Sequence, residues 1–264
     1  MSFQGKRVLA LESRRAQEIA ELIRRQGGEP FVAPSMREVP LEQNAALTDF
    51  AERLFGGEFD MLVLMTGVGT RQLNHALAEA YRETAFADAL SGLTVVERGP
   101  KPVAALREMG LKAAIIAPEP NTWRELLKAT EGRPERCIAV QEYGRSNDEF
   151  LEALRARGAE VTPVRVYRYG LPEDTGPVRE AARRLAAGAF DAALFTTAVQ
   201  IEHLLQVADE MGVGSAVRAG LTKCMVASIG PTTTESLEEF GIHPAMEPSH
   251  PKMGILVREA SERA

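Results

Sequence analysis

The 264-residue chain has little cysteine, little histidine and no long apolar run. Two cysteines, Cys137 and Cys224, are too few for a disulfide framework or a four-thiolate zinc site, and the four histidines lack metal-ligand spacing. No apolar stretch approaches the ~20 residues of a membrane-spanning helix. The apolar segment near the amino terminus is too short for a signal peptide. We therefore expect a cytoplasmic protein with reduced thiols, no metal and no membrane contact.

The chain also lacks a surplus of positive charge. Its 37 acidic and 31 basic residues give a net charge of −6, which argues against nucleic acid as a partner. Apolar residues make up 45% of the chain, enough for a sizeable core, and 264 residues suit two domains.

Short apolar runs alternate with segments of helical period along the whole chain. The runs that predict strands are 7–11, 61–66, 94–97, 113–117, 135–140, 161–167, 192–197 and 225–229. The segments that predict helices include 14–25, 70–80, 121–129, 147–157, 199–211 and 233–240. Unbroken apolar strands that alternate with helices predict an α/β fold with parallel sheets covered on both faces.

The chain repeats itself when Phe59-Asp60 is aligned with Phe190-Asp191. At this one offset, without a gap, 14 of the 53 positions from 59 to 111 are identical to their partners. We interpret this as an internal duplication. The segments 34–41 and 166–177 contain proline and extended-type residues, which is typical of linkers. Either each repeat forms its own domain, or the chain crosses twice between the two domains. The sequence pattern is compatible with both architectures.

Four corresponding loops end a strand with small residues and open a helix. They are Thr66-Gly67-Val68-Gly69-Thr70, Arg98-Gly99-Pro100-Lys101, Thr196-Thr197-Ala198-Val199-Gln200 and Ile229-Gly230-Pro231-Thr232-Thr233-Thr234. Helix amino termini bind carboxylates and phosphates, and ligands of open α/β sheets lie beyond the carboxyl ends of the strands. Each loop taken alone is also explained as an ordinary turn with a threonine cap. Together they favour a polyanionic ligand held between two halves.

Two other motifs point elsewhere and are incomplete. Gly67-Val68-Gly69 begins a dinucleotide fingerprint, but Gln72 stands where the third glycine is required. The chain has neither a Walker-type phosphate loop nor the Gly-x-Ser-x-Gly elbow of hydrolases.

Individual side chains outside these loops carry chemistry of their own. Tyr167, at the end of the 161–169 strand, could donate a proton as a general acid in a cleft, or could pack against the linker. Tyr169 is expected to pack or to be exposed. Arg145 could pair with a ligand carboxylate, or could be solvated. Thr122 is expected to cap a helix, and both cysteines to lie in the core.

At this point the chain resembles the uroporphyrinogen-III synthase family over nearly its full length. The resemblance rests on the order and spacing of Thr66-Gly67-Val68-Gly69, Val166-Tyr167-Arg168, Phe195-Thr196-Thr197 and Ser228-Ile229-Gly230-Pro231-Thr232-Thr233. It implies two similar flavodoxin-like domains with parallel sheets, joined by two extended crossing linkers. Domain 1 would combine residues 1–36 with 172–264, domain 2 would span 37–171, and the active site would lie in the cleft between them.

The resemblance also implies a reaction, in which the linear tetrapyrrole hydroxymethylbilane closes to uroporphyrinogen III with inversion of ring D and loss of water. No cofactor is implied, and the ligand is a small-molecule polycarboxylate. Tyr167 aligns with the proton donor that the family favours. The residues implied to bind substrate are Thr66, Gly67, Val68, Gly69, Lys101, Thr122, Arg145, Thr197, Ala198, Gly230, Pro231, Thr232 and Thr233. Lys101 departs from the small or hydroxyl residue of many relatives, and Gly69-Thr70 also varies.

Two other functions stay open. One is a non-catalytic cytosolic protein of the same fold that binds or senses a tetrapyrrole or another small polyanion. The other, an NAD-dependent enzyme, would need the glycine that is missing at Gln72. A monomer is expected, although the sequence itself sets no oligomeric state.

Overall fold

The computed structural model describes residues 2–41, 45–144 and 146–264. The chain divides into two compact units, unit 1 from Met1–Arg37 with Gly170–Ala264, and unit 2 from Glu38–Tyr169. No helix in the described ranges is long and apolar enough to span a bilayer.

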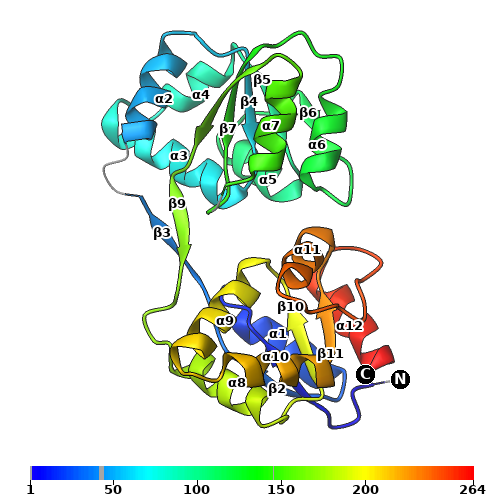
Figure 1. The fold of residues 1–264 in the computed structure, drawn as a ribbon. Helices are drawn as coiled ribbons and strands as arrows, with labels where there is room; N and C mark the ends of the chain where they lie inside the picture. Colours follow the sequence, from blue (N-terminus) through cyan, green and yellow to red (C-terminus); the bar gives the residue numbers. More distant parts are fainter. Residues whose placement is uncertain (1, 42–44, 145) are drawn as a thin grey trace. The chain divides into compact units, whose positions relative to one another are not determined.

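Unit 1 is built on a parallel sheet in the strand order β11-β10-β1-β2. The strands are β1 (Arg7–Ala10), β2 (Glu29–Val32), β10 (Ala192–Phe195) and β11 (Met225–Ser228). Helices α1 (Ala16–Arg25) and α12 (Met253–Arg263) cover one face; α8 (Gly176–Ala186), α9 (Val199–Glu210), α10 (Gly214–Lys223) and α11 (Pro231–Glu239) cover the other (Figure 1). Alternate residues of each strand supply the two cores, as Leu9 and Val8 do in β1.

Unit 2 is built on a parallel sheet in the order β6-β5-β4-β7-β8. The strands are β4 (Met61–Leu64), β5 (Thr94–Glu97), β6 (Ile115–Ile116), β7 (Cys137–Gln141) and β8 (Glu160–Val164). Helices α2 (Ala45–Phe55), α3 (Gly67–Ala80), α4 (Ala85–Leu90) and α5 (Pro100–Glu108) cover one face; α6 (Trp123–Ala129) and α7 (Asp148–Ala156) cover the other. Sheets covered on both faces confirm the predicted α/β class.

The two units share one topology. The order β5-β4-β7-β8 in unit 2 corresponds to β11-β10-β1-β2 in unit 1. The alignment that places Phe59 on Phe190 also relates β4 to β10, β5 to β11 and α5 to α11 without adjustment. Even the isolated bridge between Ala227 and Met246 has its counterpart in the pair Val96 and Ile115. In each sheet the strands of one repeat are joined by the two opening strands of the other.

The expected linkers pair with each other. Strand β3 (Arg37–Pro40) and strand β9 (Tyr167–Gly170) form a separate two-stranded sheet (Figure 1). The prediction of a single strand over 161–167 is therefore wrong, because β8 and β9 are distinct. Val164 and Tyr167 are both buried in the same core cluster although they are three residues apart. A continuous strand turns such positions to opposite faces, so the chain must break between them.

The expected strand 113–117 shortens to Ile115–Ile116. It lies at the edge of the sheet beside β5, and Ile116 is 52% exposed. The proline that follows, Pro118, has no N–H to extend the pairing.

The repeated Phe-Asp pair has a structural role at the amino edge of each sheet. The Asp60 carboxylate accepts hydrogen bonds from the backbone N–H groups of Arg136 (3.1 Å) and Cys137 (2.9 Å), at the start of β7. In unit 1 the Asp191 carboxylate accepts from the backbone N–H of Arg7 at 2.8 Å, at the start of β1. Each aspartate thus ties its repeat to the opening strand of the other repeat.

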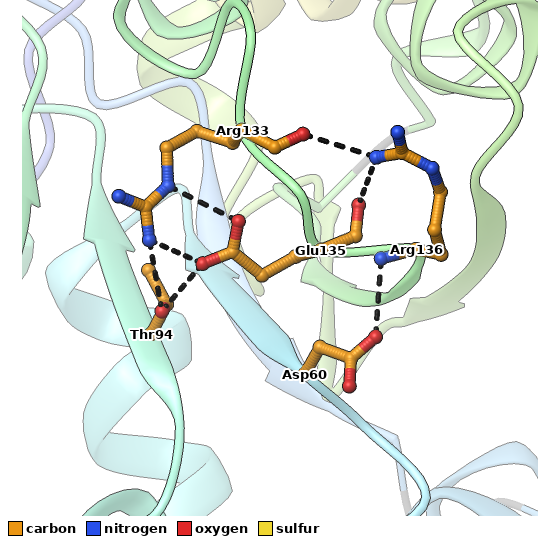
Figure 2. Close-up of polar contacts among 5 residues, drawn as sticks. All are labelled: Asp60, Thr94, Arg133, Glu135 and Arg136. Carbon is orange, nitrogen blue, oxygen red and sulfur yellow. Dashed lines mark hydrogen bonds and ion pairs between the residues drawn. The ribbon is translucent and has the colours of Figure 1, made fainter.

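A second polar network stabilises the same edge of unit 2 (Figure 2). Glu135 binds the guanidinium of Arg133 and accepts a hydrogen bond from the Thr94 hydroxyl at 2.7 Å. The Arg136 guanidinium donates to the carbonyl oxygens of Arg133 and Glu135, both at 3.0 Å. The hydrogen bond from Arg133 holds the pKa of the Glu135 carboxyl at about 2.

Replacing Glu135 with glutamine should lower the stability at neutral pH. The pKa of Glu135 is lower in the folded protein than its ordinary value of 4.5, so its contribution is complete above about 4.5 and is lost as the pH falls towards about 2. Because Arg133 is 42% exposed and solvent screens the pair, we expect a loss of about 1–2 kcal/mol at pH 7. Urea unfolding of the wild type, E135Q and the exposed control E83Q at pH 7 and pH 3 measures this. A difference between the wild type and E135Q that is equal at both pH values would contradict it.

Candidate functional site

The carboxyl edge of the unit 2 sheet carries a hydroxyl cluster. Thr66 follows β4 and caps α3, because its hydroxyl accepts a hydrogen bond from the Gly69 N–H at 3.0 Å. The same hydroxyl lies 3.2 Å from the phenol oxygen of Tyr167, which lies 3.3 Å from that of Tyr169. The two rings meet edge to face with centroids 5.4 Å apart. Thr66, which follows β4, and Tyr167, the first residue of β9, thus belong to one hydrogen-bonded group although they are 101 positions apart.

Tyr167 is 1% exposed and its ring packs into a core of unit 2. The sequence suggests either packing or a proton-donor role for Tyr167. Its ring is packed in the core, while its hydroxyl lies within hydrogen-bond distance of Thr66 in the loop before α3. Thr66 and Tyr169 are half-buried, and their oxygens lie within hydrogen-bond distance of the phenol. The phenol of Tyr167 is thus hydrogen-bonded to two hydroxyls that are less buried than itself.

Two glycines of the expected binding loop lie in close contact with neighbouring residues, Gly67 with backbone and Gly69 with a side chain. A Cβ on Gly67 would lie 2.5 Å from the carbonyl oxygen of Lys101, and a Cβ on Gly69 would lie 1.9 Å from the amide nitrogen of Gln141. The loop before α3 and the loop before α5 therefore lie against each other, with exposed Lys101 beside buried Gly67 and half-buried Val68.

Glutamine side chains occupy part of the backbone that could hold an anion. In unit 2 the Thr66 N–H donates to the side-chain oxygen of Gln141 at 3.2 Å. In unit 1 the N–H groups of Thr196 (2.8 Å) and Thr197 (3.3 Å) donate to that of Gln200. The N–H groups of Thr66 and Thr197 therefore already have side-chain partners, whereas the sequence pattern predicts helix amino termini in general as anion sites.

The sequence pattern did not predict a role for either glutamine. Gln141 closes an apolar strand, where a fully buried amide must find partners. Gln200 is the counterpart of Gly69 in the repeat, and the two positions are complementary. In unit 1 the glutamine that accepts from the loop N–H groups comes from helix α9. In unit 2 the corresponding helix position is Gly69, and strand β7 provides the glutamine instead.

A buried glutamate braces the matching loop in unit 1. Glu12, 8% exposed, follows β1 and accepts from the backbone N–H groups of Arg14 (3.0 Å) and Arg15 (3.2 Å). Its other oxygen accepts from the Thr196 hydroxyl at 2.5 Å, which in turn accepts from the Gln200 amide at 2.9 Å. This network holds the chain that leads into Thr197 and Ala198.

The loop at residues 230–233 opens α11 beside α9. Gly230 caps the helix, Pro231 occupies its first turn, and the Thr233 N–H donates to the Gly230 carbonyl at 2.9 Å. Thr232 is half-buried, whereas Thr233 is 3% exposed. The Ser236 hydroxyl donates to the Ala198 carbonyl at 3.4 Å, so the two expected loops of unit 1 lie together.

Thr122 has a structural role at the start of α6. It is 5% exposed, its hydroxyl accepts from the Arg124 N–H at 3.2 Å, and its own N–H donates to Glu125 at 2.9 Å. This is the capping box of the helix, as the sequence predicts a cap there. Arg145, the other expected contact outside the loops, lies outside the described residues.

Cysteine and histidine form no metal site within residues 2–41, 45–144 and 146–264, where no group of three or more potential ligands occurs. The sequence predicts both cysteines in the core; Cys137 and Cys224 are unbridged and partly buried, and Cys224 packs against the core of unit 1. His203 of α9 is 7% exposed, and its Nδ1 lies 2.7 Å from the carbonyl oxygen of Ser35. This contact joins α9 to the segment after β2 and gives His203 a structural role.

Glu97 closes β5 as a buried acid. Its side chain is fully buried, and neither carboxylate oxygen has a hydrogen-bond partner within the described residues. Burial raises the pKa of Glu97 to about 7, and the charge of Arg107 offsets this in part. Ser228 is the corresponding residue in unit 1.

We expect Glu97 to make unit 2 less stable as the pH rises. The pKa of Glu97 in the folded protein lies above its ordinary value of 4.5, so the favourable contribution is complete below about 4.5 and is lost as the pH rises through about 7. E97Q should therefore gain stability relative to the wild type, on the order of 2–3 kcal/mol, between pH 5 and pH 8. Denaturant unfolding at both pH values measures the change, with E83Q as control. Parallel pH dependence in the wild type and E97Q would exclude a buried ionisation.

Comparisons with known proteins give the family. The family model described as "Uroporphyrinogen-III synthase HemD" matches residues 17–258. "Uncharacterized protein YjjA" from Bacillus subtilis (strain 168) is 28% identical over 262 residues, which cover 98% of this chain and 96% of that protein.

Solved structures of uroporphyrinogen III synthases are also similar. A mutant enzyme from the extremely thermophilic bacterium Thermus thermophilus is 25% identical with a TM-score of 0.72, over 98% of this chain and 100% of that one. The Helicobacter pylori 26695 uroporphyrinogen-III synthetase is 15% identical with a TM-score of 0.55, over 98% and 100% of the two chains; at this identity the likeness shows the fold alone.

Proposed function

Because the chain belongs to the uroporphyrinogen-III synthase family, we propose that it closes hydroxymethylbilane to uroporphyrinogen III, with inversion of ring D and loss of water. The observation that carries the proposal is the hydroxyl cluster of Thr66, Tyr167 and Tyr169. It lies at the carboxyl edge of a parallel sheet, where α/β folds bind ligands. The family match supports the fold and the class of substrate, and the cluster supplies the acid.

The proposed reaction needs one proton donor and control of geometry. The bond between the hydroxymethyl carbon and its oxygen breaks, the oxygen leaves as water with a donated proton, and the pyrrole electrons form a cationic azafulvene. The substituted carbon of ring D then attacks that carbon, and rearrangement through a spiro intermediate releases a proton. No electrons are gained or lost overall, so the chemistry requires no redox cofactor.

Tyr167 is the proposed donor, with Thr66 or Tyr169 passing the proton. A phenol has an ordinary pKa near 10, so it holds its proton at neutral pH and can release it to a developing leaving group. The aromatic core around Tyr167 restricts its ring, which would fix the position of the phenol. Holding ring D so that the substituted carbon reacts is the larger task, since proximity and orientation decide which product forms.

Each unit, taken by itself, offers candidate groups for the carboxylates of the substrate. In unit 2 the candidates are Lys101 and the first turn of α3 at Gly67 and Val68. In unit 1 they are Thr232, Thr233 and the Thr197 hydroxyl. These are hydroxyls, backbone groups and single cations, which suits a chain with a net charge of −6.

Product analysis tests the proposal directly. Purified protein receives hydroxymethylbilane generated enzymatically, and the uroporphyrinogen isomers are separated after oxidation. We expect the unsymmetrical isomer III at a rate far above the spontaneous one. Only the symmetric isomer, at the spontaneous rate, would show that the chain does not catalyse this reaction.

Tyr167→Phe should reduce kcat by about 10²-fold or more, because it removes the proton and leaves the ring in place. Tyr81→Phe is the matched control, since Tyr81 is 49% exposed and contacts Phe55 instead of a loop of the site. Isomer III formation under single-turnover conditions measures both. Equal rates for Tyr167→Phe and the wild type would reduce Tyr167 to a packing residue.

One observation favours the second candidate function, a non-catalytic protein that binds a tetrapyrrole or another small polyanion. Tyr167 is 1% exposed, which limits its contact with a bound ligand. Such a site could bind without turnover. Tight binding of uroporphyrinogen in the absence of isomer III formation would support this function over the synthase.

A further inference from the structure

Arg98 is a half-buried cation at the carboxyl edge of the unit 2 sheet. It follows β5 directly, and its backbone is held on both sides: its N–H donates to the Leu64 carbonyl at 3.1 Å, and its carbonyl accepts from the Asn121 amide at 3.2 Å. The position of the side chain is therefore set by rigid neighbours, as a binding residue requires.

Tyr143 fixes the guanidinium. The Arg98 side chain donates to the Tyr143 hydroxyl at 2.8 Å, and its guanidinium carbon lies 4.6 Å from the centroid of the same ring. Arg98 comes from the end of β5 and Tyr143 from the end of β7, and β4 lies between these strands. The pair thus reaches across the end of β4, the strand that leads into Thr66.

The charge of Arg98 is uncompensated in the described part of the chain, where it forms no ion pair. Other arginines of unit 2 differ: Arg71 binds Glu108, and Arg53 binds Glu58 and Glu160. The adjacent Glu97 does not neutralise Arg98, since its carboxylate is buried without a partner and successive residues of a strand turn to opposite faces. A half-buried guanidinium with unused donors favours an anionic ligand, above all a planar carboxylate.

The corresponding loop of unit 1 carries no such cation. In the repeat alignment, Arg98 corresponds to Ile229 and Lys101 to Thr232. The two loops share Gly-Pro and the start of a helix, at α5 and α11, yet only the unit 2 loop is cationic. Structural needs common to both loops therefore do not explain Arg98.

We propose that Arg98, oriented by Tyr143, is a carboxylate-binding residue that gives the site its preference for highly carboxylated tetrapyrroles. The proposal rests on the proposed function for the class of ligand. Arg98 contacts the ligand through the guanidinium N–H groups that Tyr143 leaves unused, and Tyr143 acts as a positioning residue. A ligand with fewer carboxylates gains less from this contact.

Equilibrium binding of stable porphyrins tests the assignment without turnover. Uroporphyrin III, with eight carboxylates, and coproporphyrin III, with four, are titrated into the full chain by fluorescence quenching. R98A should weaken uroporphyrin binding about tenfold or more, whereas R98K, which keeps the charge but loses the fork, should weaken it less. Y143F should weaken it about two- to fivefold, and the preference for uroporphyrin over coproporphyrin should shrink in R98A.

Control variants separate this contact from general charge and folding. R155A removes an exposed arginine of α7 that pairs with Glu152, and should bind like the wild type. R98Q keeps most of the side chain, so it replaces R98A if thermal unfolding shows that R98A is destabilised. Equal uroporphyrin affinity in R98Q and the wild type, or no binding by the wild type, would overturn the proposal. Arg98-dependent binding without isomer III formation would instead reject the synthase reaction and leave the binding residue in place.

Discussion

The pairing of β1 with β10, and of β4 with β7, is the constraint on which both units depend. Each pair joins strands from different repeats, and Val8 lies opposite Ala192 although the two are far apart in the sequence. A parallel sheet covered on both faces needs a complete set of apolar strands, so neither repeat can bury its own sheet without the opening strands of the other. Asp60 and Asp191 reinforce this exchange at the amino edge, where each binds the first backbone N–H groups of the strand that the other repeat supplies.

The same pairing aligns the carboxyl ends of strands and so gathers the loops of the site. Thr66, Tyr167 and Gln141 lie together because β4, β7 and β8 all end at the same edge of the sheet, and Tyr167 follows shortly after β8. The two units differ in the residue that binds the N–H group after the central strand. The N–H after the central strand is satisfied by Gln141 from a neighbouring strand in unit 2 and by Gln200 from the following helix in unit 1. A buried amide hydrogen must have a partner, but the fold does not dictate which element provides it.

This divergence bears on function. A duplicated pair of loops would present the same groups twice, yet the loop before α5 carries Arg98 and Lys101 where the loop before α11 carries Ile229 and Thr232. The hydroxyl cluster belongs to unit 2 as well, since the residue of unit 1 that corresponds to Thr66 is Thr197, whose hydroxyl donates to the Thr196 carbonyl. Unit 2 thus combines the candidate acid with the candidate cations.

The sequence by itself determined the α/β class, the repeat and most of the strands, because apolar runs and periodicity are local and depend on burial alone. It also located the loops, since small residues and threonine caps mark the ends of strands. The repeat alone is compatible with two architectures, the family resemblance implied the crossed one, and the tertiary structure showed which strands pair in each sheet. It also decided that β8 and β9 are separate, because Val164 and Tyr167 must reach one core. Gln141, Glu12 and the pair of Arg98 with Tyr143 were beyond sequence reasoning for the same reason. Their significance comes from partners 45 to 184 positions away, which no local pattern records.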